Sequence, residues 1–194
     1  MMYSMEIPKI TAGGVKIPQL GLGLWKVTKE YDLRKSVINA LALGYRHFDT
    51  AQAYGNEAFL GDVLHESDVP RKELFITSKL ARANMGWDHA MQSFEQTLKD
   101  LQTDYVDLFL VHFPVTEHRR PAWHHMQEIA KSGKAKAIGV SNYTITHLEE
   151  LWRESEIKPV VNQVEVHVFL QQPELLEYCS SRGIVVEAYS PLAH

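Results

Sequence analysis

Four titratable side chains of types suited to proton transfer lie at or just after the ends of successive predicted strands. They are Asp49, Tyr54, Lys79 and His112, and the strands are 47–50, 74–78 and 106–111. A lysine ammonium held against a tyrosine oxygen favours the phenolate and lowers the phenol pKa from its usual ~10. An aspartate paired with that lysine keeps it charged, and a neutral histidine can orient a carbonyl oxygen by hydrogen bonding. Such a group predicts reduction of a C=O bond if a hydride source lies nearby.

Each of these residues also has a simpler structural interpretation. Asp49 can cap a helix or a turn, and Tyr54 can be an ordinary surface tyrosine of a turn. His112, between apolar neighbours, can be a core histidine whose hydrogen bonds are satisfied. Lys79 is harder to explain in this way, because a lysine at the end of a buried strand is rare unless it is paired.

A second group of residues predicts where a hydride source would bind. Ser141 and Asn142 end the fifth predicted strand and Gln163 lies in the sixth, where their side chains can donate to and accept from a carboxamide. Tyr189 ends the seventh strand, where its ring can lie flat on a nicotinamide or serve only as a core aromatic. Trp25 ends the first strand and can wall the pocket.

Three histidines close in sequence look like a metal site at first sight. They are His118, His124 and His125. Their spacing does not place them on one face of a helix, and no carboxylate completes the set, so we predict no metal there.

The elements that must position these residues repeat as strand followed by helix. The predicted pairs are 20–25 with 32–44, 47–50 with 57–66, 74–78 with 87–101, 106–111 with 121–131, 135–140 with 144–154 and 160–164 with 173–182, and a seventh strand spans 184–188. Asp32 and Thr144 are the expected helix N-caps. Strand starts recur about every 24–32 residues, which indicates a βα period. Strands separated by whole helices are parallel, and their uniformly apolar character indicates a sheet covered on both faces.

Two closures of such a sheet are possible, an open doubly wound sheet or a (βα)8 TIM barrel. The first would need G-x-G-x-x-G after the first strand, but Gly21-Leu22-Gly23 is followed by Leu24, Trp25 and Lys26. We therefore predict a single incomplete barrel domain, residues 1–194, with seven of the eight strands and a length below the typical ~250 residues. Residues 6–17 predict an N-terminal β-hairpin that covers the barrel bottom.

Composition places the chain in the ordinary globular class. Of its 194 residues 45% are hydrophobic and 23% charged, and the net charge of −4 gives no electrostatic reason to expect nucleic acid or an anionic membrane surface. Cys179 is the one cysteine, which excludes an internal disulfide and a multi-cysteine zinc site. The N-terminus lacks a signal-peptide pattern and no apolar run approaches the ~18–20 residues of a membrane span, so a cytoplasmic location is expected.

Two long motifs identify the chain as similar to a known family. The run 44–51, followed at the family's spacing by Glu57 and Leu60-Gly61, resembles the first signature of the aldo-keto reductases. Met126, followed after nine residues by the run 136–143, resembles the second. The resemblance runs from about Ile7 to the last residue. The runs 49–52, 69–74 and 103–108 most resemble the bacterial 2,5-diketogluconate and methylglyoxal reductases.

The resemblance implies a role for each site residue. Asp49, Tyr54, Lys79 and His112 match the catalytic tetrad of the family, with Tyr54 as the proton donor. The residues implied to bind a nicotinamide cofactor are Gly23, Leu24, Trp25, Asp49, Ser141, Asn142, Gln163, Tyr189, Ser190 and Leu192. The implied substrate pocket is lined by Trp25, Tyr54, Trp87, His112 and Phe113, although Trp87 and Trp123 are most simply packing residues. Leu24 departs from the threonine common in the family and lacks its hydroxyl.

The resemblance also implies the cofactor and the partners. The cofactor is NADPH, with NADH not excluded, and the substrate is a small-molecule carbonyl compound. The family's third signature, which grips the 2′-phosphate of NADPH, would lie beyond His194, as would the substrate-selecting loop and the closing strand. The complete family fold is expected to be a monomer, whereas an open barrel can self-associate. The alternative hypothesis is an inactive fragment that acts, if at all, through association with another chain.

Overall fold

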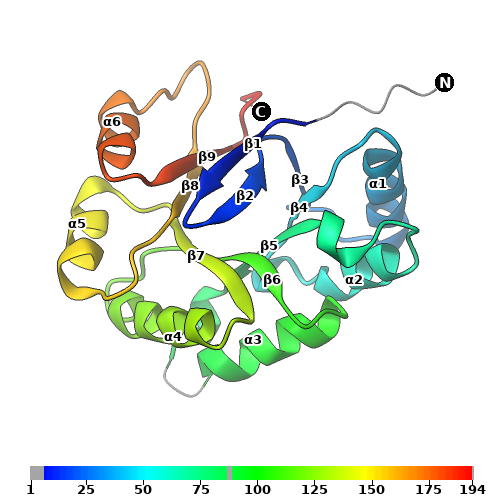
Figure 1. The fold of residues 1–194 in the computed structure, drawn as a ribbon, viewed down its shortest axis with the longest axis horizontal. Coiled ribbons are helices and arrows are strands. Elements are labelled where there is room, and N and C mark those ends of the chain that lie inside the picture. Colours follow the sequence, from blue (N-terminus) through cyan, green and yellow to red (C-terminus); the bar gives the residue numbers. More distant parts are fainter. Residues whose placement is uncertain (1–6, 87–88, 194) are drawn as a thin grey trace.

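Seven parallel strands form one curved sheet in the same order as in the sequence, β3-β4-β5-β6-β7-β8-β9 (Figure 1). The computed structural model describes residues 7–86 and 89–193. The strands are β3 (Gly21–Gly23), β4 (His47–Asp49), β5 (Phe75–Leu80), β6 (Val106–Val111), β7 (Ala135–Ser141), β8 (Val161–Glu165) and β9 (Val185–Tyr189). The helices around them are α1 (Glu30–Ala42), α2 (Glu57–His65), α3 (His89–Asp100), α4 (Arg119–Lys131), α5 (Ile145–Glu154) and α6 (Pro173–Ser181). The prediction of a βα barrel with seven strands present is confirmed.

The barrel has two hydrophobic regions, because alternate residues of each strand point to opposite faces. In β6, Phe109 and Val111 belong to the larger core between the sheet and the helices. Leu108 and Leu110 belong to a smaller core inside the barrel. All four side chains are fully buried, which a sheet covered on both faces requires.

The N-terminal hairpin packs against the smaller, inner core of the barrel. Strands β1 (Lys9–Ala12) and β2 (Val15–Pro18) pair antiparallel, and in Figure 1 they lie over the centre of the ring of strands. Ala12 and Ile17 pack in the inner core. At the turn, Gly13 has a φ of +54°, and a Cβ atom there would come 2.4 Å from Cγ1 of Val160. Glycine therefore lets the turn approach the start of β8 closely.

The starts of α1 and α5 test the two predicted N-cap residues. The prediction that Asp32 caps the first helix is wrong: α1 begins at Glu30, and Lys29 in the cap position makes no side-chain cap bond. Asp32 instead lies in the first turn, where negative charge is favoured by the helix dipole. Thr144 does cap α5, and it forms a capping box with His147.

Strands β3, β4, β5 and β7 differ in length from their predictions, and the differences in β3 and β5 bear on the site. The first strand is shorter than 20–25, because pairing with β4 covers only Gly21–Gly23, and Trp25 therefore lies beyond its end. Strand β5 is longer than 74–78, so Lys79 lies inside the strand rather than after it, paired in register with Leu110. Its side chain consequently faces the barrel interior.

Candidate active site

Lys79 is the centre of a hydrogen-bonded group at the carboxyl ends of β4 and β5. Its Nζ donates to Oδ1 of Asp49 at 2.5 Å, to the backbone oxygen of Thr50 at 3.0 Å and to the hydroxyl oxygen of Tyr54 at 3.3 Å. The lysine side chain is 1% exposed and that of Asp49 is 13% exposed. Each of the three N–H bonds of this buried ammonium thus has an oxygen acceptor, which is the arrangement that a buried charge requires.

The loop after β4 brings the tyrosine to this lysine. A short 3-10 turn, Gln52–Tyr54, follows the strand and ends at Gly55, whose φ of +66° favours glycine. The side-chain oxygen of Gln52 accepts from the backbone N–H of Ala81 and from Nδ2 of Asn84, both at 2.9 Å. The turn is therefore fastened to the segment that follows β5.

His112 completes the group from the next strand. Its ring lies edge-on to the ring of Tyr54, with centroids 5.6 Å apart. Burial, and next the positive charge of Lys79, lower the pKa of His112 to about 4. The imidazole is therefore neutral at neutral pH, and it can hydrogen-bond a carbonyl oxygen without adding a second cation.

The pKa of Tyr54 differs from the sequence-based expectation. We expected Lys79 to lower it, but the pKa is raised, because burial of the phenol outweighs the attraction of the lysine charge. Lys79 itself keeps its charge: burial lowers its pKa, but the charge and hydrogen bond of Asp49 together with the charges of Tyr54 and Glu187 outweigh burial, and the net direction is upward. The site thus holds a protonated phenol beside a permanent cation.

The predicted carboxamide contacts bond one another in this structure. Ser141 donates its hydroxyl to the backbone oxygen of Gln163 at 2.9 Å. Asn142 donates through Nδ2 to the backbone oxygen of His112 and to Oγ of Ser141, and its Oδ1 accepts from the hydroxyl of Tyr189 at 2.9 Å. Nε2 of Gln163 donates to Oδ2 of Asp49 at 2.8 Å, which joins this group to the lysine centre.

The predicted rim residues divide into accessible and inaccessible ones. The ring of Trp25 is 55% exposed, Leu192 is 93% exposed, and Gly23 has open space where a Cβ atom would lie. The side chain of Leu24 is fully buried, and its backbone N–H and C=O are bonded to Asp49 and Asn56. Phe113 is exposed, at 37%, with the Arg82 guanidinium over its ring. Ser190 has a left-handed backbone, and Trp87 lies outside the described residues.

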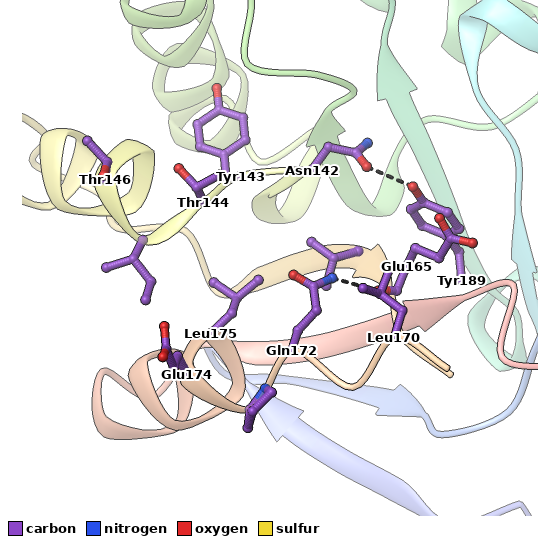
Figure 2. A pocket seen from close by; sticks show the side chains of 13 residues that line it. Asn142, Tyr143, Thr144, Thr146, Glu165, Leu170, Gln172, Glu174, Leu175 and Tyr189 are labelled. Carbon is purple, nitrogen blue, oxygen red and sulfur yellow. Dashed lines mark hydrogen bonds between the residues drawn. The ribbon is translucent and has the colours of Figure 1, made fainter. Parts of the chain in front are cut away.

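A cavity of about 600 Å³ is bordered by Asn142 and Tyr189 of this region. Figure 2 shows the side chains that line it. It lies between the loop after β7 and the segment that joins β8 to α6, and Asn142 and Tyr189, joined by their hydrogen bond, border it. Asp49, Tyr54, Lys79 and His112 are not among its lining residues. The cavity therefore lies beside the lysine centre and does not contain it.

Sequence reasoning missed Glu187, whose Oε1 accepts from Nε2 of Gln163 at 2.7 Å. A signal was available: Glu187 is an acidic residue within an apolar strand, two positions before Tyr189 and therefore on the same face. Thr50 was missed as well, because it contributes a backbone oxygen, which no side-chain pattern reveals.

Residues 7–86 and 89–193 can also be considered for metal binding and for membrane-spanning helices. No group of three or more histidine, cysteine, aspartate or glutamate side chains there is arranged to hold a metal ion. Trp123 packs in the outer core and donates to the backbone oxygen of Ile157, as expected for a structural tryptophan. None of the helices in this part of the chain is both long enough and apolar enough to cross a membrane.

Comparison with known proteins gives one consistent result. The model of the aldo/keto reductase family matches residues 19–194. A protein named glyoxal reductase from Bacillus subtilis is 46% identical over 92% of this chain, and a methylglyoxal reductase from Escherichia coli O157:H7 is 42% identical over 99%. The chain spans 65% of the length of the first and 69% of the second.

Solved structures agree with the sequence comparisons. An aldo/keto reductase from Brucella melitensis superposes with a TM-score of 0.93 at 38% identity, over 97% of this chain and 75% of the other. An aldo-keto reductase from Bombyx mori, solved in complex with NADP, superposes with a TM-score of 0.90 at 35% identity, over 96% of this chain and 67% of the other. Family model, relatives and fold together show that this chain belongs to the aldo/keto reductase family.

Proposed function

We propose that this chain carries the catalytic centre for NADPH-dependent reduction of an aldehyde or ketone to an alcohol. The observation that carries the proposal is the 3.3 Å contact from Nζ of Lys79 to the hydroxyl of Tyr54, made by a lysine that is paired with Asp49. A phenol held against a buried ammonium is a proton donor whose conjugate base is stabilised as it forms. Relatives named glyoxal and methylglyoxal reductases support small dicarbonyl compounds as the first substrates to test.

The residues around the lysine centre fit the nicotinamide end of such a cofactor. Both N–H bonds of the Gln163 amide are used by carboxylates, which leaves its oxygen to accept from the NH2 group of a carboxamide. The ring of Tyr189 is 36% exposed and offers a flat surface for a nicotinamide. When bound, the reduced cofactor supplies the hydride. Binding would also require Asn142 to share its Oδ1 with, or give up, the Tyr189 hydroxyl.

The chain's own residues divide the proton chemistry among them. In the proposed step, a hydride adds to the carbonyl carbon while the O–H bond of Tyr54 breaks and its proton passes to the carbonyl oxygen. Lys79 stabilises the resulting phenolate, and Asp49 keeps Lys79 charged and in place. His112, neutral at neutral pH, orients the carbonyl oxygen by hydrogen bonding.

Turnover of methylglyoxal with NADPH, followed by loss of NADPH absorbance, tests the proposal. Wild-type protein should consume NADPH, and Tyr54→Phe should lower kcat by about 10²–10⁴, the contribution of a positioned general acid. The phenylalanine variant should still bind NADPH, measured by fluorescence titration, because the change removes one oxygen from the ring. Full activity of Tyr54→Phe would refute the mechanism.

Tyr105→Phe provides a matched control. Tyr105 carries the same hydroxyl but packs under the guanidinium of Arg71, at the opposite end of β6 from His112. Its loss should leave kcat unchanged. A loss of activity equal to that of Tyr54→Phe would show that any tyrosine truncation damages the barrel.

A second candidate function is association with another chain without catalysis. It is favoured by the open edges of the sheet, since β3 and β9 each pair on one side only among the described residues. Tyr31, Ile38 and Leu43 on or next to α1 are also exposed apolar side chains. Absence of both NADPH binding and turnover, together with a mass above that of one chain in light scattering, would favour this candidate. The cytoplasmic location expected from the sequence stays a prediction.

A further inference from the structure

Glu187 is a partly buried acidic residue with a buried carboxyl oxygen, and the proposed reaction gives it no role. It lies on β9 in register with Gln163 on β8, and the two side chains meet inside the barrel. Its Oε1 accepts from Nε2 of Gln163 at 2.7 Å. Its Oε2 is buried and has no hydrogen-bond partner within the part of the chain that the structure describes. A carboxyl group in this position is costly, so its presence calls for a physical explanation.

Gln163 connects Glu187 to the lysine centre. The same Nε2 atom donates to Oδ2 of Asp49 at 2.8 Å, and Oδ1 of Asp49 accepts from Lys79. Gln163 and Asp49 are 114 positions apart in sequence and lie on β8 and β4, which are not neighbours in the sheet. The amide thus bridges the barrel interior and uses both of its N–H donors on carboxylates.

Two carboxylate neighbours determine which way the amide points. An amide oxygen turned toward the Asp49 carboxylate, which is paired with Lys79, would place two acceptors in contact, so the nitrogen must face Asp49. The second N–H of the amide then reaches Oε1 of Glu187. A hydrogen bond to Asp49 alone would leave the amide free to rotate about that bond. With Glu187 as the second acceptor, the amide plane is fixed, and its oxygen is left as the acceptor for a ligand.

The bond from Gln163 does not require Glu187 to be ionised. Burial raises the pKa of the Glu187 carboxyl; among its charged neighbours Asp49 acts in the same direction, and His47 and Lys79 act against it. A protonated carboxyl still accepts through its carbonyl oxygen. A glutamine side chain, which also carries a carbonyl oxygen at that position, should therefore replace Glu187.

We propose that Glu187 is a positioning residue that fixes the Gln163 amide between two carboxyl groups, so that the amide oxygen accepts from the carboxamide of the cofactor. The identity of the ligand in this role rests on the proposed reductase function. The orientation of the amide does not depend on that function. The two can therefore be tested separately.

The first experiment observes the amide without any cofactor. In wild-type protein labelled with ¹⁵N, both Nε2 protons of Gln163, assigned by loss of their signals in Gln163→Leu, should be protected from exchange with solvent. In Glu187→Leu one proton should lose its protection, and in Glu187→Gln both should keep it. Fast exchange of either proton in wild-type protein would overturn the proposal, whether or not the variants fold.

The second experiment measures NADPH affinity by fluorescence titration. Glu187→Leu should raise the Kd about tenfold, and Glu187→Gln, which keeps a carbonyl oxygen at that position, should stay within about twofold of wild type. Glu177→Leu, an exposed glutamate on α6, is the control and should not change the Kd. Equal affinity of the wild type and Glu187→Leu would overturn the positioning role. Failure of wild-type protein to bind NADPH, with both amide protons protected, would refute the reductase function and leave the orientation of the amide intact.

Discussion

The barrel interior contains two groups of side chains of opposite chemistry, which we call the apolar layer and the polar layer. The apolar layer is Ala12, Ile17, Phe75, Leu108, Leu110, Ala137 and Val161. The polar layer is His47, Asp49, Thr77, Lys79, Gln163 and Glu187. On β5, Phe75 belongs to the first layer, and Thr77 and Lys79, two and four residues on, belong to the second. Inward-facing positions two residues apart on one strand therefore serve different purposes.

The boundary between the layers shows how they coexist. His47 packs edge-on against Phe75, with ring centroids 4.7 Å apart, while its Nε2 atom lies 2.9 Å from the hydroxyl oxygen of Thr77 and its Nδ1 atom 3.3 Å from the backbone oxygen of Pro18. The apolar layer needs only volume and burial, whereas each member of the polar layer needs a partner of the right kind. Substitutions in the two layers should therefore fail in different ways.

The largest effect is expected when the buried ion pair is broken. Lys79→Met leaves the carboxylate of Asp49 without its cation and should lower the free energy of unfolding by about 3–5 kcal/mol. It should also abolish turnover. Urea denaturation measures the first effect. Lys134→Met, which removes an ion pair with Glu95 that is 44% exposed on both sides, should cost at most about 1 kcal/mol. Equal losses of unfolding free energy in Lys79→Met and Lys134→Met would contradict the distinction between a buried and an exposed ion pair.

A cavity in the apolar layer should reduce stability without affecting the chemistry. Leu108 is fully buried, and Leu108→Ala should lower the free energy of unfolding by about 2–5 kcal/mol. Leu108→Met, which nearly conserves volume, should cost less than about 1.5 kcal/mol. NADPH affinity and turnover per folded molecule should stay near wild type in both variants. A large loss of turnover in the folded alanine variant would show that the two layers are coupled.

The effect that is smallest per step of the experiment is the pH dependence of stability. The pKa of His112 is lowered to about 4, so between about pH 4 and 6.5 the unfolded chain binds a proton at this residue that the folded chain does not. The contribution of His112 to stability is therefore fully present above the unfolded pKa, and it is lost as pH falls through this range, by at most about 1.4 kcal/mol per pH unit.

The imidazole signals in NMR spectra check this directly. The His112 resonance, assigned with His112→Gln, should titrate near pH 4, and the variant should lose that part of the pH dependence of stability. A His112 midpoint at or above 6.5 would show that the site admits a second cation and would remove the proposed role of a neutral imidazole.

The sequence by itself determined the order and direction of the elements. Largely apolar runs such as Val106–Val111 indicate strands covered on both faces, and whole helices between them make the strands parallel. Because the carboxyl ends of parallel strands meet on one side, the strand-end positions of Asp49 and His112 were enough to place them near each other. Local signals failed at boundaries: Asp32 looked like a cap, but the helix dipole favours an acidic residue throughout the first turn.

Only the tertiary structure decided the contacts across the barrel and the balance of charges. Gln163 meets Asp49 and Glu187 because curvature of the sheet brings β8 opposite β4, and no local spacing encodes that meeting. The direction of the Tyr54 pKa depends on how deeply the phenol is buried relative to its distance from Lys79, and both quantities arise from packing. Sequence fixes which groups a strand can present, whereas distance and burial, which set the energies of those groups, exist only once the chain has folded.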